Sequence, residues 1–194
     1  MKNKHLILLI LLAVVMAVGC TESSNEKTNS QSVGNSAQTI ENSSQVHENN
    51  LTTTDTSTNQ DAEWISVMQA QSDMIQTDLA GISSNQDTFD AEGLAKSGQT
   101  IVDDTQKAID ENDNYTVSPA LEEAKEHWGF ALRNYNMAGQ FTVIGANAYL
   151  DGDDASASTN FEKATTFFNS GNADVNLTVS YIRAYALEAQ NQEQ

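Results

Sequence analysis

The chain has 194 residues, of which 27 are acidic and nine are Lys or Arg, so its formal net charge at pH 7 is −18. This charge excludes nucleic acid and anionic lipid surfaces as main ligands, because both require a basic patch. The single cysteine excludes an internal disulfide. Basic residues along the chain are too scattered to form a patch: Lys96, Lys107, Lys125, Arg133, Lys163 and Arg183. The acidity fits a solvated surface, with cation binding or adaptation to salty surroundings as the alternative.

The first residues have the pattern of an export signal. Lys2 and Lys4 precede an apolar run at 6–18. The run has thirteen residues, whereas an ordinary spanning helix needs about 20. A signal-peptide core is therefore predicted.

The motif Ala17-Val18-Gly19-Cys20 follows this run. It resembles the lipobox of prokaryotic lipoproteins, with Ala17 where that family usually has Leu. The resemblance implies that residues 1–19 are removed and that Cys20 carries lipid. The protein would then be anchored on the extracytoplasmic face of the cell membrane. An ordinary signal peptide or an uncleaved anchor is the alternative.

Residues 20–60 are predicted to be a disordered tether that begins at the lipidated cysteine. Residues 21–60 are rich in Ser, Thr, Asn, Gln and Glu, with only isolated apolar residues, so they cannot form a core. As a flexible coil the tether would span roughly 35 Å. Four Asn residues match the glycosylation sequon, either as acceptors or by chance in an Asn/Thr-rich chain: Asn42, Asn50, Asn114 and Asn176.

From residue 61 the apolar residues recur at spacings of three and four, which is typical of amphipathic helices. The first predicted helix begins at Asp61 and ends near Ser83. The second runs from about Asp87 to Glu111, with Asp87 and Asp90 at its positive end.

The third predicted helix begins most clearly, because Ser118 is a candidate N-cap and Pro119 suits the first helical position. It ends before Gly152, which tolerates a positive φ. The fourth runs from about Asp154 to Gln190.

These stripes predict an all-α fold in which residues 61–194 form an acidic, up-down-up-down four-helix bundle. A stack of helical repeats is the alternative, but no repeat length recurs. The short turn at Gly152 places Gly145 opposite Phe161 and Tyr135 opposite Gly171, so large residues face small ones.

The same stripes predict the two earlier turns. A turn at Tyr115 places Trp128 near Val102. A turn at Ser84–Asn85 places Ile75 near Leu94.

No catalytic, cofactor or metal residue is predicted. Glu123 and His127 could share a metal weakly, but a solvated surface pair is the preferred interpretation. Asp151, Asp153 and Glu162 occupy positions 1, 3 and 12 of a calcium loop, yet Ala155 and Ser156 lack the required oxygen ligand and glycine. A loop in which Gly152 caps one helix and the aspartates favour the next is preferred.

The aromatic residues on the predicted seams are assigned to the core. Five lie off the seams, and any of these that are exposed together would mark a partner surface: Trp64, Phe89, Phe130, Phe141 and Tyr181.

Two segments, YTVSPALEEAKEHW at 115–128 and YNMAG at 135–139, resemble uncharacterised lipoproteins of methanogenic archaea. Those proteins carry a helical domain after a polar tether. The resemblance implies a cell-envelope protein of unassigned activity, without a catalytic signature.

The leading hypothesis is a non-catalytic surface lipoprotein that binds an envelope protein or has a structural role. The alternative is a solute- or metal-binding module that feeds a membrane transporter, for which a pocket at Gly139, Gly145 or Gly171 would be needed. A hydrolytic or redox enzyme is the third hypothesis. A polar-lined cavity, as opposed to a solid core, would favour the second.

Overall fold

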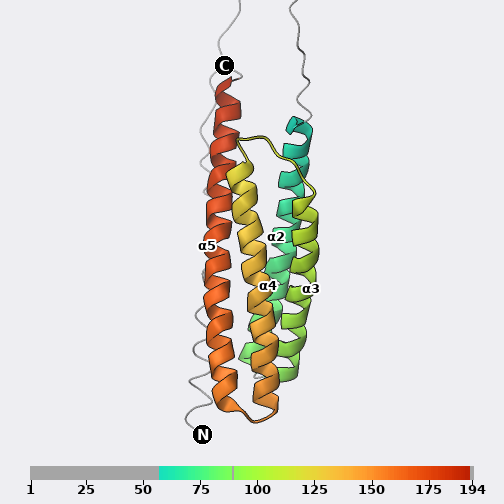
Figure 1. Ribbon diagram of the computed structural model, residues 1–194, viewed down its shortest axis with the longest axis vertical. Coiled ribbons are helices and arrows are strands. Elements are labelled where there is room, and N and C mark those ends of the chain that lie inside the picture. Colours follow the sequence, from blue (N-terminus) through green and yellow to red (C-terminus); the bar gives the residue numbers. More distant parts are fainter. Residues whose placement is uncertain (1–56, 89, 193–194) are drawn as a thin grey trace, which may run out of the picture.

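The computed structural model describes residues 57–88 and 90–192, and Figure 1 shows their arrangement. The described part is an all-α, up-down-up-down four-helix bundle, as predicted. Its helices are α2 (Ser57–Asp87), α3 (Ala91–Asp113), α4 (Glu122–Leu150) and α5 (Asp154–Gln192). None of these helices is long and apolar enough to cross a membrane.

Several predictions concern residues outside the described part. These are the signal peptide 1–19, the lipidated Cys20, most of the tether 20–60, the sequon residues Asn42 and Asn50, and the aromatic Phe89.

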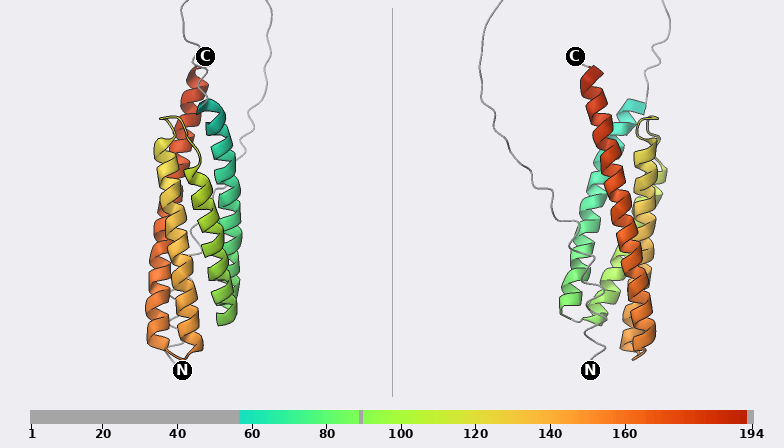
Figure 2. Two further views of the ribbon diagram at one scale, coloured as in Figure 1. Left: turned by 45° about the vertical axis from the view of Figure 1, so that its right-hand side comes forward. Right: turned by 90° about the vertical axis from the view of Figure 1, so that its left-hand side faces the viewer.

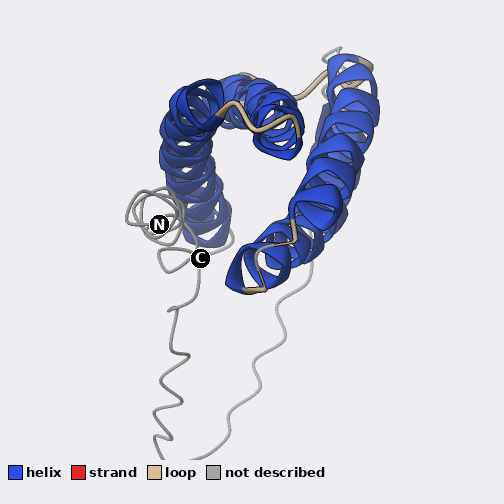
Figure 3. Cartoon of the chain, turned by 90° about the horizontal axis from the view of Figure 1, so that it is seen from below, coloured by secondary structure: helices blue, strands red, loops and turns tan. Residues whose placement is uncertain are grey.

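Each helix packs closely against its neighbour in the chain: α2 against α3, α3 against α4, and α4 against α5. The C-terminal end of α2, the N-terminal end of α3 and the short turn at 151–153 lie at the same end of the bundle, and the longer connection 114–121 crosses the other end (Figures 1 and 2). Figure 3 shows the same helices from below, viewed down their long axes.

The α4–α5 register is confirmed by two glycines that accommodate aromatic rings. A Cβ placed on Gly145 would lie 2.9 Å from the ring of Phe161, and one on Gly171 would lie 2.9 Å from the ring of Tyr135. These are the pairs that the stripe pattern predicts.

The α3–α4 register was predicted wrongly. The predicted turn at Tyr115 would set Gly139 opposite Ala91, but Gly139 instead packs against Gly98. Here a Cβ on Gly139 would lie 2.7 Å from the Gly98 carbonyl oxygen. The shift is about two helical turns, because the connection continues to Leu121 before α4 begins.

The α2–α3 register is wrong by a similar amount. The predicted turn would set Trp64 level with Thr105, but the Trp64 indole N–H donates to Asn112 Oδ1 at 2.8 Å. The reason is that α2 continues to Asp87 instead of ending near Ser83.

Two buried tryptophans connect the helices near the end of the bundle that the 114–121 connection crosses. Trp64 and Trp128 are each 1% exposed. The Trp128 indole N–H donates to Gln71 Oε1 at 2.8 Å, and the Gln71 amide donates to Glu111 Oε2 at 2.9 Å. Each indole therefore contributes apolar burial while its polar N–H is satisfied.

A buried aspartate fixes the long connection. Asp61 is 1% exposed, and its carboxylate accepts the Ser118 backbone N–H at 2.7 Å and the Tyr185 hydroxyl at 3.2 Å. This one side chain on α2 thus holds both the 114–121 connection and α5. Burial and the neighbouring Asp61 raise the pKa of Tyr185.

Asp87 was predicted wrongly at the start of the second helix, because it is the last residue of α2. Two other predicted helix ends are confirmed. Asp90 caps α3 by accepting the Gly93 N–H at 2.9 Å. Gly152 has a φ of 80°, and Asp153 accepts the Ser156 N–H at 3.0 Å, which also lowers the pKa of Asp153. Ser118 was predicted wrongly as an N-cap, because α4 begins at Glu122 and no side chain caps it.

Candidate functional site

The side of α4 that faces away from the bundle carries large apolar side chains that the described chain leaves partly exposed. Phe130 is 41% exposed, Met137 36%, Ile144 49% and Leu150 51%. Phe130, Met137 and Ile144 are seven residues apart, so they lie on one side of the helix. Leu150 follows Ile144 by six residues and lies about 120° further around the helix, at its C-terminal end. We call this surface the α4 outer face, which consists of Phe130, Arg133, Met137, Gln140, Ile144 and Asn147.

The α4 outer face lacks acidic residues in a chain that is rich in them. Residues 127–150 contain no Asp or Glu, although the chain has 27 in total. Arg133 is the cation of the face, and its guanidinium lies 5.8 Å from the centroid of the Phe130 ring. An apolar, acid-free stripe on an otherwise acidic surface is typical of an interaction site.

Aromatic contacts border this face on the α5 side. The rings of Phe141 and Phe167 are stacked with centroids 5.5 Å apart, and the Lys163 ammonium lies 5.2 Å from the Phe141 centroid. The face therefore continues into half-buried aromatic surface.

His127 joins α4 to α5 at the upper end of the same border. Its Nδ1 lies 3.1 Å from Asp174 Oδ1, and its ring stacks on Tyr181 with centroids 5.7 Å apart. The predicted surface pair of His127 with Glu123 is thus replaced by an interhelical contact. Burial and the nearby Asp174 raise the pKa of the Tyr135 hydroxyl on the same interface.

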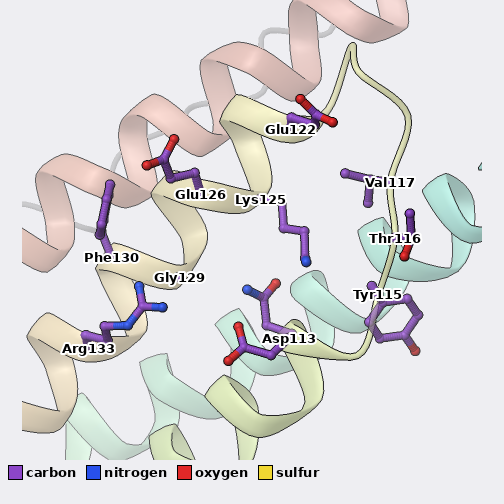
Figure 4. Close-up of a pocket in the computed structure, with 11 residues that line it drawn as sticks. Asp113, Tyr115, Thr116, Val117, Glu122, Lys125, Glu126, Gly129, Phe130 and Arg133 are labelled. Carbon is purple, nitrogen blue, oxygen red and sulfur yellow. The ribbon is translucent and has the colours of Figure 1, made fainter.

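A cavity of about 560 Å³ lies where the 114–121 connection passes over α4, and Figure 4 shows it. The side chain of Lys125 projects into its centre (Figure 4). Its lining comes from the end of α3, the connection and the first half of α4: Asn112, Asp113, Tyr115, Thr116, Val117, Glu122, Lys125, Glu126, Gly129, Phe130 and Arg133. Phe130 and Arg133 thus belong both to the cavity and to the α4 outer face.

The cations of the cavity are not paired with carboxylates of the described chain. Within residues 57–88 and 90–192 the ion pairs are Lys107 with Asp104 and His127 with Asp174. Lys125 and Arg133 form no ion pair among these residues, although the cavity lining also includes Asp113, Glu122 and Glu126.

Gly139, Gly145 and Gly171, where the alternative function requires a solute pocket, do not line one. Gly139 packs on the Gly98 backbone, while Gly145 and Gly171 are covered by the rings of Phe161 and Tyr135. Their missing side chains are used for close helix packing, which leaves no room for a ligand at these points.

The residues considered for calcium binding form a solvated turn. Asp151 and Asp153 are exposed, and Glu162 is exposed on α5. Asp153 caps α5, as the preferred interpretation proposed. Within the described ranges no three His, Cys, Asp or Glu side chains come together as a metal site.

The sequon residues that fall within the described chain are exposed. Asn114 follows α3, and its side-chain amide donates to the Asp110 carbonyl at 2.9 Å, while Asn176 lies on the surface of α5.

Sequence reasoning identified part of the face. It singled out Phe130 as a residue off the core seams, but it missed Met137 and Ile144. The seven-residue spacing and the absence of acidic residues along 127–150 were the available signals.

Comparison with protein-family models found no match, and searches of curated proteins and of solved structures found no significant match.

Proposed function

We propose that this protein is a non-catalytic lipoprotein, held at the extracytoplasmic face of the cell membrane by lipid on Cys20, whose bundle binds another protein through the α4 outer face. The observation that carries the interaction role is the partial exposure of Phe130, Met137 and Ile144 on one acid-free face of α4. Burying such a face against a partner removes apolar area from water, at roughly 25 cal/mol per Å² before the costs of association.

The interaction role is tested on intact cells that produce the full chain with a photoactivatable crosslinking residue at Met137. Asn169, an exposed polar residue on α5, serves as the control position. We expect one discrete crosslinked species from Met137 and none from Asn169. Adding Ile144→Lys should abolish that species. Equal crosslinking at both positions, or none at Met137, would contradict the proposal.

The anchor is tested separately. Cys20→Ser should release the full chain from the membrane fraction and prevent incorporation of labelled lipid, because this family attaches lipid to the cysteine sulfur. Unchanged membrane association of the variant would show that another segment holds the protein.

The cavity at the 114–121 connection favours one second candidate, a binding site for a small carboxylate solute that is passed to a membrane transporter. The supporting observation is that Lys125 projects into a cavity of about 560 Å³ while forming no ion pair within the described chain. A carboxylate there would gain charge-assisted hydrogen bonds.

This second candidate is tested by thermal unfolding of the full chain with a panel of small carboxylates. A ligand should raise the melting temperature of the wild type but not of Lys125→Ala. Lys107→Ala is the matched control, because the Lys107 side chain is 76% exposed on α3. If no carboxylate stabilises the wild type, the cavity has no such role.

A further inference from the structure

Two cations lie beside the exposed apolar residues of α4, and each is positioned over an aromatic ring. The Arg133 guanidinium lies 5.8 Å from the Phe130 centroid, and the Lys163 ammonium lies 5.2 Å from the Phe141 centroid. Both cationic side chains are exposed, and neither forms an ion pair within residues 57–88 and 90–192. The rings therefore hold the two charges in place, while the N–H groups of both cations remain able to donate to an outside acceptor.

The two rings set the spacing of these charges along α4. Phe130 and Phe141 are eleven residues apart, which is about 16 Å along the helix and a rotation of only about 20° around it. Met137 and Ile144 lie on the same side of α4 as the two rings. A partner that covers these apolar side chains therefore also meets both cations.

The carboxylate of α5 that lies nearest this surface is already engaged. Asp174 accepts a hydrogen bond from the Asn134 amide at 3.0 Å, and its other oxygen lies 3.1 Å from His127 Nδ1. On α4 itself, residues 127–150 contain no Asp or Glu. The middle of the α4 outer face is thus locally cationic on a chain whose net charge is −18.

Two further carboxylates lie outside the surface. Glu126 precedes Phe130 by one turn of α4 and so lies beyond the N-terminal end of the apolar run. Glu162 precedes Lys163 on α5, and successive residues of a helix point about 100° apart around its axis. Neither carboxylate pairs with Arg133 or Lys163.

The complement of this surface is a helix that carries apolar residues and two carboxylates on one side. Eleven residues of a partner helix span the same 16 Å, so carboxylates at that spacing reach Arg133 and Lys163 together. Charge-assisted hydrogen bonds to a guanidinium add geometric specificity to the burial of apolar area. An anionic membrane fits less well, because such surfaces are recognised by clusters of about four to eight basic residues.

We propose that the partner of the α4 outer face is an amphipathic helix of another protein, which presents two carboxylates about eleven residues apart to Arg133 and Lys163. This inference rests on the proposed function, because it names the chemistry of the partner at the proposed interaction surface. The acidic remainder of the bundle repels such a helix, so the charge pattern also restricts where the helix binds.

Binding of a defined peptide tests the inference. The full chain is reconstituted in vesicles of neutral lipid and titrated with a fluorescent helical peptide that has one apolar side and two glutamates eleven residues apart. A second peptide has glutamine at both positions. The glutamate peptide should bind roughly three- to tenfold more tightly, which is the effect expected of two exposed ion pairs. Equal or weaker binding of the glutamate peptide would overturn the inference.

Charge-reversed variants locate the peptide on the face. Arg133→Glu and Lys163→Glu should each remove the preference for the glutamate peptide, while binding of the glutamine peptide changes little. Lys107→Glu is the matched control and should keep the preference, because the Lys107 side chain is 76% exposed on α3. Circular dichroism confirms that each variant remains folded. An equal loss of preference in Lys107→Glu would show that net charge, and not this face, causes the effect.

Crosslinking from Met137 on intact cells separates this inference from the proposed function. Loss of the crosslinked protein species in an Arg133→Glu, Lys163→Glu double variant, with retention in Lys107→Glu, would support both. A protein species that persists in the double variant would overturn the acidic helix while supporting the interaction role. Crosslinking to lipid alone, or no crosslinked species from Met137, would overturn both.

Discussion

Individual polar residues inside the bundle are mostly well satisfied, and the exceptions are informative. The side chains of Asp61 and Gln71 both have hydrogen-bond partners. Gln86 does not: it is 2% exposed, and neither its amide nitrogen nor its amide oxygen has a hydrogen-bond partner in the described chain. A buried amide without partners opposes folding.

Replacing Gln86 with Met should therefore stabilise the protein by about 1–2 kcal/mol, because the thioether fills similar space without unpaired polar atoms. Chemical denaturation measures the free energy of unfolding. Gln76→Met, at an exposed position of the same helix, should change it by less than about 0.5 kcal/mol. A destabilised Gln86→Met variant would indicate that the amide has an unrecognised partner, such as water.

Asp78 is the second exception. Its Oδ2 has no hydrogen-bond partner in the described chain, and burial, together with the charge of Asp104, raises its pKa to about 6. The unfolded chain loses this proton near pH 4. The folded protein loses it only near pH 6, so ionisation of Asp78 lowers the stability as the pH rises from about 4 to about 6.

Asp78→Asn should consequently raise the melting temperature at pH 7.5 and have little effect at pH 4. The gain in free energy should be about 1 kcal/mol, because solvent screens this partly exposed carboxyl. Thermal scans at both pH values measure it. Asp73→Asn, at an exposed position on α2, should change little at either pH. An equal gain from Asp78→Asn at both pH values would argue against a titrating Asp78.

At the scale of the elements, glycines decide how closely the helices approach. Gly98 and Gly139 allow α3 and α4 to meet through their backbones. Gly81 lies on α2 and faces α3, where an added Cβ would be 3.3 Å from the Ser97 hydroxyl oxygen. The same substitution should therefore have opposite effects at the two crossings.

Gly139→Ala should destabilise the bundle by about 1–3 kcal/mol, because the new Cβ would meet the Gly98 carbonyl oxygen and separate the helices. Gly81→Ala should be neutral or stabilising by up to about 1 kcal/mol through its higher helix propensity. Denaturant unfolding of the two variants checks the contrast. If Gly139→Ala were as stable as the wild type, the close crossing of α3 and α4 would be incorrect.

The registers show which part of the element arrangement is predictable. The α4–α5 pairs followed from the sequence because Gly152 marks a short turn unambiguously, with Gly145 meeting Phe161 as predicted. The other two registers were wrong by about two turns. The helical spacing of residues continues through Gln86 at the end of α2, and the apolar stripe of α4 already includes Leu121 before that helix begins. The spacing alone therefore does not reveal where the chain reverses direction.

For the whole molecule, net charge sets the dependence on salt. With a net charge of −18, repulsion among carboxylates opposes the compact state and any association between copies. Salt shortens the range of this repulsion from about 10 Å at 0.1 M to about 3 Å at 1 M.

The melting temperature should rise between 0.1 M and 1 M NaCl. The increase should be smaller at pH 4, where many carboxylates are protonated. Thermal scans of the full chain at both salt concentrations and both pH values measure it. An equal increase at pH 4 would show that repulsion among carboxylates is not the cause.

The sequence by itself determined that residues after 60 form amphipathic helices, which sides of those helices carry apolar residues, and where α5 begins. Local periodicity and turn chemistry suffice for these features. It also singled out Phe130 as a residue off the core seams. Tertiary structure decided the α2–α3 and α3–α4 registers and the exposure of Met137, Ile144 and Leu150. The physical reason is that periodicity fixes the direction of a side chain on its helix, whereas its burial depends on whether a neighbouring helix covers that direction.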